Sequence, residues 1–126
     1  MEVTPVVAED RQLIQAYGDG GFKIAGERYD GSVVVFPGRT LAWAPASLDG
    51  LTIEHFEPVF SETPPPEILI FGAGVRFALL PRQLREALRG RVPGLGVEAM
   101  DTAAACRTYN VLLAEERRVV ASLIAI

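Results

Sequence analysis

Glu67-Ile68-Leu69-Ile70-Phe71, residues 67–71, is the stretch that decides the fold, because it is apolar on both faces of an extended chain. A strand with one solvated face alternates apolar and polar residues, whereas a strand covered on both faces is a continuous apolar run. Residues 67–71 are therefore predicted to form a covered central strand. Val119 to Ile126 has the same character, interrupted only by Ser122, and is also predicted to lie at a sheet centre.

Two helical segments and one further strand separate these runs. Residues 82–91 place Leu84 and Leu88 one turn apart after Pro81, which suits the start of a helix. Residues 95–100 are predicted to form a strand. Residues 102–115 are predicted to form a helix whose apolar stripe consists of Ala105, Cys106, Tyr109, Leu112 and Leu113. A strand–helix–strand connection makes its two strands parallel, so the loops after residues 71 and 100 are expected at one edge of the sheet.

The N-terminal half predicts an antiparallel β-meander. Asp30-Gly31 lies between β-forming runs and is a typical hairpin signal. Pro37-Gly38 closes the meander, and residues 40–43 are predicted to form a brief strand. Residues 52–56 are predicted to form a short helix that Pro58 limits.

The chain has 126 residues, of which 49% are hydrophobic and 22% charged. This length and balance indicate a single globular domain, residues 1–126, rather than a disordered chain. Residues 1–12 are predicted to be loosely attached. The order of the elements predicts an α/β domain with a mixed sheet.

Charge and cysteine content exclude several classes of protein. The formal net charge is -4, so non-specific binding to nucleic acid, which requires many basic groups, is not expected. One Cys and one His cannot form an internal disulfide or a Cys/His zinc site. No metal site and no cofactor are predicted.

The expected compartment is the cytoplasm. The first 15 residues lack the basic-then-apolar pattern of a signal peptide. The longest apolar stretch, residues 119–126, is far shorter than the roughly 20 residues that a membrane-spanning helix needs. No membrane span is therefore expected.

Residues 100–113, MDTAAACRTYNVLL, resemble the signature of a small family that includes mitochondrial complex I (NADH dehydrogenase) assembly factor three and bacterial proteins of unassigned function. Residues 20–22 with 31–33, residues 67–74 and residues 116–126 are similar to the same family. The resemblance implies a three-layer α/β fold with a mixed five-stranded sheet. It implies an assembly role for the mitochondrial member and carries no catalytic residue. The start of the chain does not look like a mitochondrial presequence, so a bacterial origin is expected.

A candidate ligand site follows the strand at residues 67–71. Gly72-Ala73-Gly74 occupies the place of a dinucleotide-binding loop, but Phe77 stands where the third glycine of that fingerprint belongs. The helix predicted at residues 102–115 is expected to start nearby, and a helix N-terminus favours an anion. The candidate ligand residues are Gly72, Gly74, Arg76, Asp101 and Thr102, with Thr102 as the helix N-cap.

The candidates for catalysis are few. Cys106 lies about one turn into the last helix, where the helix N-terminus can lower a thiol pKa. Its place on the apolar stripe favours the alternative, a buried and inert side chain. His55 is the only imidazole, and nothing in the sequence places it near Cys106. A nucleophile–base pair is therefore not predicted.

The charge map offers candidates for docking. Residues 72–94 carry five arginines and one glutamate, and Arg82, Arg85 and Arg89 share one helix face. This face is either an ordinary solvated surface or a docking face for an acidic partner, an anionic ligand or membrane headgroups. Arg107 and Asn110, opposite the apolar stripe of the last helix, belong either to a face that accepts another protein surface or to an ordinary solvent-facing helix surface.

The leading hypothesis is a non-enzymatic binding or assembly protein with a protein partner that the sequence does not identify. The alternative is a small-anion or nucleotide-binding protein, or an enzyme, that uses the Gly72–Gly74 turn and the start of the last helix. The residues favour a protein that is not an enzyme without deciding the question. They do not predict the oligomeric state.

Overall fold

The structure, a computed structural model, describes residues 7, 8 and 10–126. Its elements are, in chain order, β1 (Ile14–Gly18), β2 (Gly21–Ile24), β3 (Glu27–Asp30), β4 (Val33–Val35), β5 (Thr40–Ala42), the 3-10 helix η1 (Ile53–Phe56), α1 (Glu57–Phe60), β6 (Ile68–Gly72), α2 (Arg82–Arg91), β7 (Gly96–Met100), α3 (Thr102–Ala114) and β8 (Val119–Leu123). The predicted order of strands and helices from β6 to β8 is confirmed, as is the brief strand β5.

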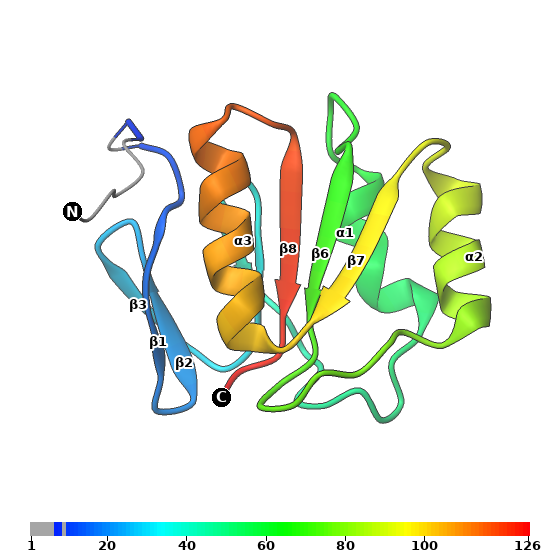
Figure 1. Ribbon diagram of the computed structural model, residues 1–126, viewed down its shortest axis with the longest axis horizontal. Helices are drawn as coiled ribbons and strands as arrows, with labels where there is room; N and C mark the ends of the chain where they lie inside the picture. Colours follow the sequence, from blue (N-terminus) through cyan, green and yellow to red (C-terminus); the bar gives the residue numbers. More distant parts are fainter. Residues whose placement is uncertain (1–6, 9) are drawn as a thin grey trace.

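The strands form two sheets. One has three strands in the order β1-β2-β3, and the other has five in the order β5-β4-β8-β6-β7. At the centre of the larger sheet, β8 runs parallel to β6 and antiparallel to β4. β6 is also parallel to β7, and the three strands end at the lower end of the molecule in Figure 1. The predicted mixed sheet, with residues 67–71 and 119–126 in its interior, is confirmed.

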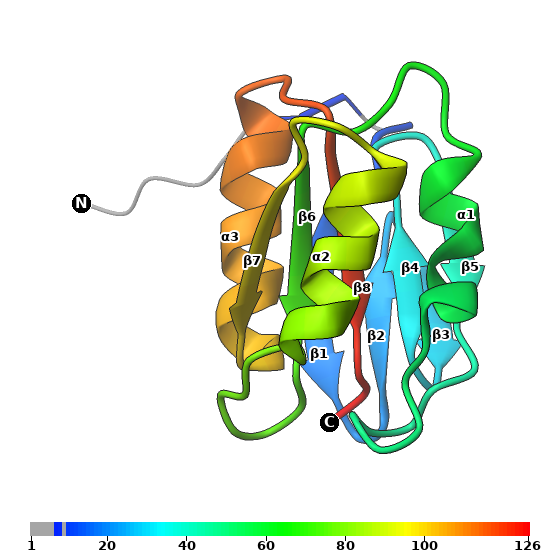
Figure 2. The same cartoon turned by 90° about the vertical axis from the view of Figure 1, so that its right-hand side faces the viewer.

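Both faces of the larger sheet are covered, which gives the protein three layers. On one face, η1, α1 and α2 pack against Leu69, Phe71 and Val120. On the other face, α3 and the small sheet pack against Ile70 and Ala121. Figure 2 shows α3 on one side of the sheet and α1 and α2 on the other. This arrangement explains why β6 and β8 are apolar on both faces.

The N-terminal half differs from the predicted meander at Asp30-Gly31. A meander does form, but it consists of β1, β2 and β3. The strand that follows Gly31, β4, pairs instead with β5 and β8 in the larger sheet, so the predicted hairpin at Asp30-Gly31 is wrong. The reason is burial: every residue of β4 is buried, whereas β3 is polar and mostly exposed. An all-apolar strand is stable in the sheet that is covered on both faces.

Two further predictions need correction. β1 was not among the predicted strands, and only Ile14 of its five residues is buried. Pro58 does not end the helix predicted at residues 52–56, because η1 continues directly into α1 with Pro58 in the first helical turn. A proline is tolerated there because the first N–H groups of a helix have no intrahelical acceptor.

Most of the segment predicted to be loose, residues 1–12, lies outside the described residues, namely residues 1–6 and 9. Its last residue is held in place. The N–H of Gln12 donates to Pro37 O at 3.0 Å, and the hydroxyl of Thr40 donates to Gln12 Oε1 at 2.7 Å. The chain is therefore ordered against the β4–β5 turn before β1 begins.

Ser122 breaks the apolar pattern of β8. Its hydroxyl is buried between Val34 and Phe71 on the neighbouring strands and has no hydrogen-bond partner among the described residues. A buried hydroxyl without a partner loses its contacts with water and gains nothing in return. Ser122→Ala is therefore expected to raise the free energy of unfolding by about 1 kcal/mol, measured by urea denaturation.

Ser32→Ala is the matched control. Ser32 is also buried, but its Oγ accepts a hydrogen bond from the N–H of Ala125 at 3.0 Å. Its loss is expected to lower the free energy of unfolding by about 1 kcal/mol. Equal destabilisation by both substitutions would contradict this explanation of Ser122.

Candidate functional site

The Gly72–Gly74 turn packs directly against the start of α3, as the sequence predicts for strands that end at one edge. The N–H of Gly74 donates to Thr102 Oγ1 at 2.9 Å, and the Thr102 hydroxyl donates to Ile124 O at 2.8 Å. The N–H of Thr102 in turn donates to Gly74 O at 2.8 Å. Thr102 is completely buried. These contacts connect β6, α3 and the chain after β8 to one another.

Gly72 is required by this close approach. A side-chain Cβ at this position would lie 2.9 Å from Leu123 Cδ2 and 3.0 Å from Thr102 Oγ1. It would also lie 3.1 Å from Thr102 Cα, a backbone atom of the helix, so glycine allows α3 to approach β6 closely at this point. The glycine signal in the sequence therefore reports helix–strand packing.

The predicted role of Thr102 as the N-cap of α3 is wrong. The N-cap is Asp101, whose Oδ1 accepts a hydrogen bond from the N–H of Ala104 at 2.9 Å. An N-cap residue lies outside the helix in extended geometry and uses its side chain in this way. Thr102 is instead the first helical residue, and its hydroxyl points into the fold.

Few polar groups remain for a ligand at this edge. Of the five predicted ligand residues, Gly72, Gly74 and Thr102 are buried, Asp101 is half-buried, and only Arg76 is exposed. The Asp101 carboxylate and the Thr102 hydroxyl are both engaged within the protein. The anion site stays a prediction, in which the exposed Arg76 is the remaining side-chain donor.

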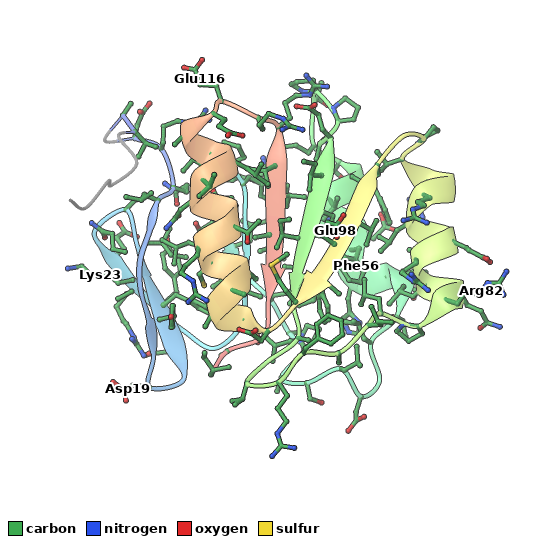
Figure 3. All side chains as sticks on the ribbon, in the orientation of Figure 1. Asp19, Lys23, Phe56, Arg82, Glu98 and Glu116 are labelled. Carbon is green, nitrogen blue, oxygen red and sulfur yellow. The ribbon has the colours of Figure 1, made fainter. Side chains whose placement is uncertain are left out.

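Two shallow pockets, of about 240 and 250 Å³, lie at the opposite end of the sheet, where β8 begins. Both are lined in part by Arg11 and Glu116, and Figure 3 shows Glu116 projecting at that end of the molecule. Neither pocket includes a predicted ligand residue. Both are smaller than the roughly 300 Å³ at which ligand pockets usually begin.

Cys106 and His55 lie on opposite faces of the larger sheet. Cys106 is buried in the core formed with α3, whereas His55 precedes Phe56 in the core on the other face. His55 Nδ1 accepts a hydrogen bond from the N–H of Thr52 at 3.0 Å, which holds the imidazole to the start of η1. The sequence-based prediction that Cys106 is buried is confirmed, and the sheet separates it from the imidazole.

Cys106 is expected to react slowly in the native protein. Burial raises the pKa of its thiol from 9.0 to about 12. That shift lowers the thiolate fraction at neutral pH by roughly a thousandfold. Labelling with a thiol reagent at pH 8 should be slow and become rapid in 6 M guanidinium; rapid labelling of the folded protein would overturn the interpretation.

Arg107 and Asn110 both contact β1, and their docking role stays a prediction. Asn110 Oδ1 accepts from the N–H of Ile14 at 2.9 Å, and its Nδ2 donates to Ile14 O at 2.8 Å. Arg107 Nη1 donates to the hydroxyl of Tyr17 at 3.1 Å. Both side chains thus hold β1 against α3. The Asn110 amide pairs with the backbone N–H and C=O of Ile14, as a neighbouring strand would. The sequence analysis missed this role because it did not predict β1.

The arginines of α2 differ in their environments. Arg82 and Arg89 are exposed, and Figure 3 shows Arg82 pointing away from the body of the protein. Arg82 forms an ion pair with Glu86 at 3.0 Å, while Arg85 is half-buried. Among the described residues, no carboxylate lies within ion-pair distance of Arg85 or Arg89. We call Arg82, Arg85 and Arg89 together the arginine face of α2.

An exposed apolar loop immediately precedes α2. Val75, Phe77 and Leu79 are 80%, 61% and 58% exposed. No hydrogen bond joins residues 75–79 to any other part of the chain that the structure describes. The Gly74–Thr102 hydrogen bonds and the buried Leu80 hold the two ends of the loop, and Ala78 within it is half-buried. We call residues 75–79 the apolar loop.

The sequence analysis did not find this surface. It considered Phe77 only as the position where the dinucleotide-binding fingerprint has its third glycine, and it assigned Val75 and Leu79 no role. The available signal was the alternation of Val75, Phe77 and Leu79 between a glycine turn and the proline that precedes α2.

The fold and its surfaces define a small three-layer α/β protein. The chain belongs to the family described as "Protein of unknown function (DUF498/DUF598)", whose model matches residues 14–124. This membership confirms the resemblance noted in the sequence.

Three relatives illustrate the family. The chain is 34% identical over 112 residues to NADH dehydrogenase [ubiquinone] 1 alpha subcomplex assembly factor 3 of Danio rerio, a match that covers 89% of this chain and 63% of that protein. It is 34% identical to an uncharacterised protein of Rhodobacter capsulatus, covering 88% of this chain and 82% of that one. The crystal structure of an outer membrane protein from Bartonella henselae is similar, with 37% identity, a TM-score of 0.82, and coverage of 93% and 97%.

The chain thus spans less than two-thirds of the length of the vertebrate assembly factor. Within the described part of the chain, no helix has the length and apolar character needed to cross a membrane.

Proposed function

We propose that this chain is a non-enzymatic binding protein that acts in the assembly of a complex of the NADH dehydrogenase type. The assembly part of the proposal is supported by the relatives named as assembly factors of that complex. The proposed compartment is the cytoplasm.

The observation that carries the binding part is the apolar loop. Val75, Phe77 and Leu79 are large apolar side chains grouped within five residues, and each is more than half exposed. Grouped apolar side chains on a protein surface usually mark a place that another molecule covers. The loop makes no hydrogen bonds with the described remainder of the chain, so its backbone groups are also available to a partner.

The enzyme alternative has less support from the described residues. Its strongest nucleophile candidate, Cys106, is buried, and its thiol pKa is raised to about 12. Its ligand candidates at the Gly72–Gly74 turn are engaged with Thr102. A binding protein needs none of these groups to be free.

The test is co-purification at native expression from a cell that contains the complex. We expect the wild-type chain to retain a subunit or assembly protein of the NADH dehydrogenase complex in stoichiometric amount. Phe77→Ser with Leu79→Ser should lose at least nine-tenths of it, because the covered apolar surface is removed.

Val111→Ser is the matched control, since Val111 is 50% exposed on α3, away from the apolar loop. It should retain the partner fully. Thermal unfolding must show that all variants remain folded. Equal retention by the loop variant and the control would contradict the proposal.

A further inference from the structure

The charge around the apolar loop indicates what kind of partner can cover it. Residues 72–94 carry five arginines and one glutamate, although the whole chain has a net charge of -4. Arg76 lies within the loop, and α2 begins three residues after Leu79. Along α2, Arg82 and Arg89 are separated by about 10 Å at a rise of 1.5 Å per residue. Apolar and basic groups therefore follow one another along the chain from Val75 to Arg89.

A second copy of this chain is a poor occupant. Two copies that met through their apolar loops would bring two arginine faces together, and like charges at short range oppose association. Pairing of two copies through β7, an edge strand of the larger sheet, is also unfavourable. Glu98, labelled in Figure 3, is the central and the one exposed residue of β7, and pairing of two such strands would place two carboxylates close together.

An anionic membrane surface is also disfavoured. Membrane attraction depends on several basic residues facing the lipid, each worth about 1 kcal/mol. Arg82 is already paired with Glu86. Asp19 projects at the same end of the molecule as the apolar loop in Figure 3, and an anionic surface would repel its carboxylate. The remaining occupant is a protein segment that brings its own negative charge.

We propose that the apolar loop and the arginine face of α2 together bind an acidic amphipathic segment of another protein. Apolar side chains of the segment cover Val75, Phe77 and Leu79. Its carboxylates pair with Arg76 and Arg89, which have no carboxylate within ion-pair distance among the described residues. Half-buried Arg85, whose Nε lacks a hydrogen-bond partner there, lies between the two sets of contacts. This inference rests on the proposed binding function and specifies the chemistry of the partner.

The test uses three synthetic helical peptides and the isotope-labelled chain. One peptide carries Leu on one face and Glu on the other; the second replaces Glu with Lys, and the third replaces Leu with Ala. We expect the Leu/Glu peptide to shift the amide resonances of residues 75–79 and of α2. The Leu/Lys and Ala/Glu peptides should bind at least tenfold more weakly, and 0.5 M NaCl should weaken the Leu/Glu peptide.

Protein variants locate the charge effect. Arg76→Gln with Arg89→Gln should weaken the Leu/Glu peptide at least fivefold, because two charge-paired contacts are lost. Lys23→Gln removes a positive charge from the one exposed residue of β2, on a different surface, and should leave the affinity unchanged. Equal binding of the Leu/Glu and Leu/Lys peptides, or no shift at residues 75–79 at millimolar peptide, overturns the inference.

Two other outcomes overturn it in favour of a different occupant. Sedimentation of the chain with phosphatidylglycerol vesicles, lost on Phe77→Ser, would indicate a lipid surface. A dimer in analytical ultracentrifugation that Phe77→Ser dissociates would indicate a second copy. If the peptide test fails while a complex subunit still co-purifies through the loop, the binding function stands and only the acidic character of the partner is refuted.

Discussion

Removal of residues 121–126 is expected to abolish folding. The deletion cuts the central strand β8 in the middle and removes the residues that pair with both β4 and β6, including Ser122 and Leu123. It also removes Ile124 and Leu123 from the cores on the two faces of the sheet. The five-stranded sheet would separate into two pairs of strands with unpaired inner edges, which aggregate.

The measurement is soluble yield together with far-ultraviolet circular dichroism. We expect an insoluble or unfolded product, and no cooperative thermal transition. A chain that lacks only Ile126 is the control and should unfold cooperatively, since Ile126 contributes one backbone acceptor, to the N–H of Gly20. A cooperative transition in the longer deletion would show that β8 is dispensable.

Thr102→Val is expected to lower the free energy of unfolding by about 3 kcal/mol. Valine has the shape of threonine but no hydroxyl, so the Gly74 N–H loses its acceptor and the Ile124 carbonyl loses its donor. Both groups are buried beside a completely buried side chain. A buried polar group without a partner costs about 1–3 kcal/mol. Chemical denaturation of the purified variant measures the loss.

Thr102→Ser separates the hydroxyl from the methyl group. Serine keeps both hydrogen bonds and loses only one buried methyl, so a loss of about 1 kcal/mol is expected. If the valine variant were as stable as the wild type, Thr102 would not connect β6, α3 and the end of β8 as described.

The C-terminal half of the fold could be predicted because its local pattern and its tertiary role agree. Residues 67–71 and 119–126 are apolar on both faces, and both strands are covered by helices. The stripe through Ala105, Tyr109 and Leu113 faces the core. In such cases periodicity alone carries the structural information.

The N-terminal half could not be predicted in the same way. Asp30-Gly31 is a strong local signal for a hairpin, but whether β4 pairs with β3 depends on strands that lie far away in the sequence. β4 gains β5 and β8 as neighbours, and β8 follows more than 80 residues later. Local turn chemistry does not report such a partner.

The candidate site, too, could be predicted from the sequence only in part. Sequence order correctly placed the Gly72–Gly74 turn beside the start of α3, because parallel strands end at one edge. It did not show that Thr102 would engage the turn, nor that Asn110 would hold β1. The exposure of Val75, Phe77 and Leu79 depends on how the loop leaves the sheet, which no residue pattern specifies.

Photocross-linking from position 77 in living cells tests the central claim most directly. A photoreactive phenylalanine analogue replaces Phe77 in one strain and Val111 in another, at native expression. We expect position 77 to give one discrete product that contains a subunit or assembly protein of the NADH dehydrogenase complex, and position 111 to give none. The absence of a discrete product at position 77, or the same product from both positions, would contradict a binding function at the apolar loop.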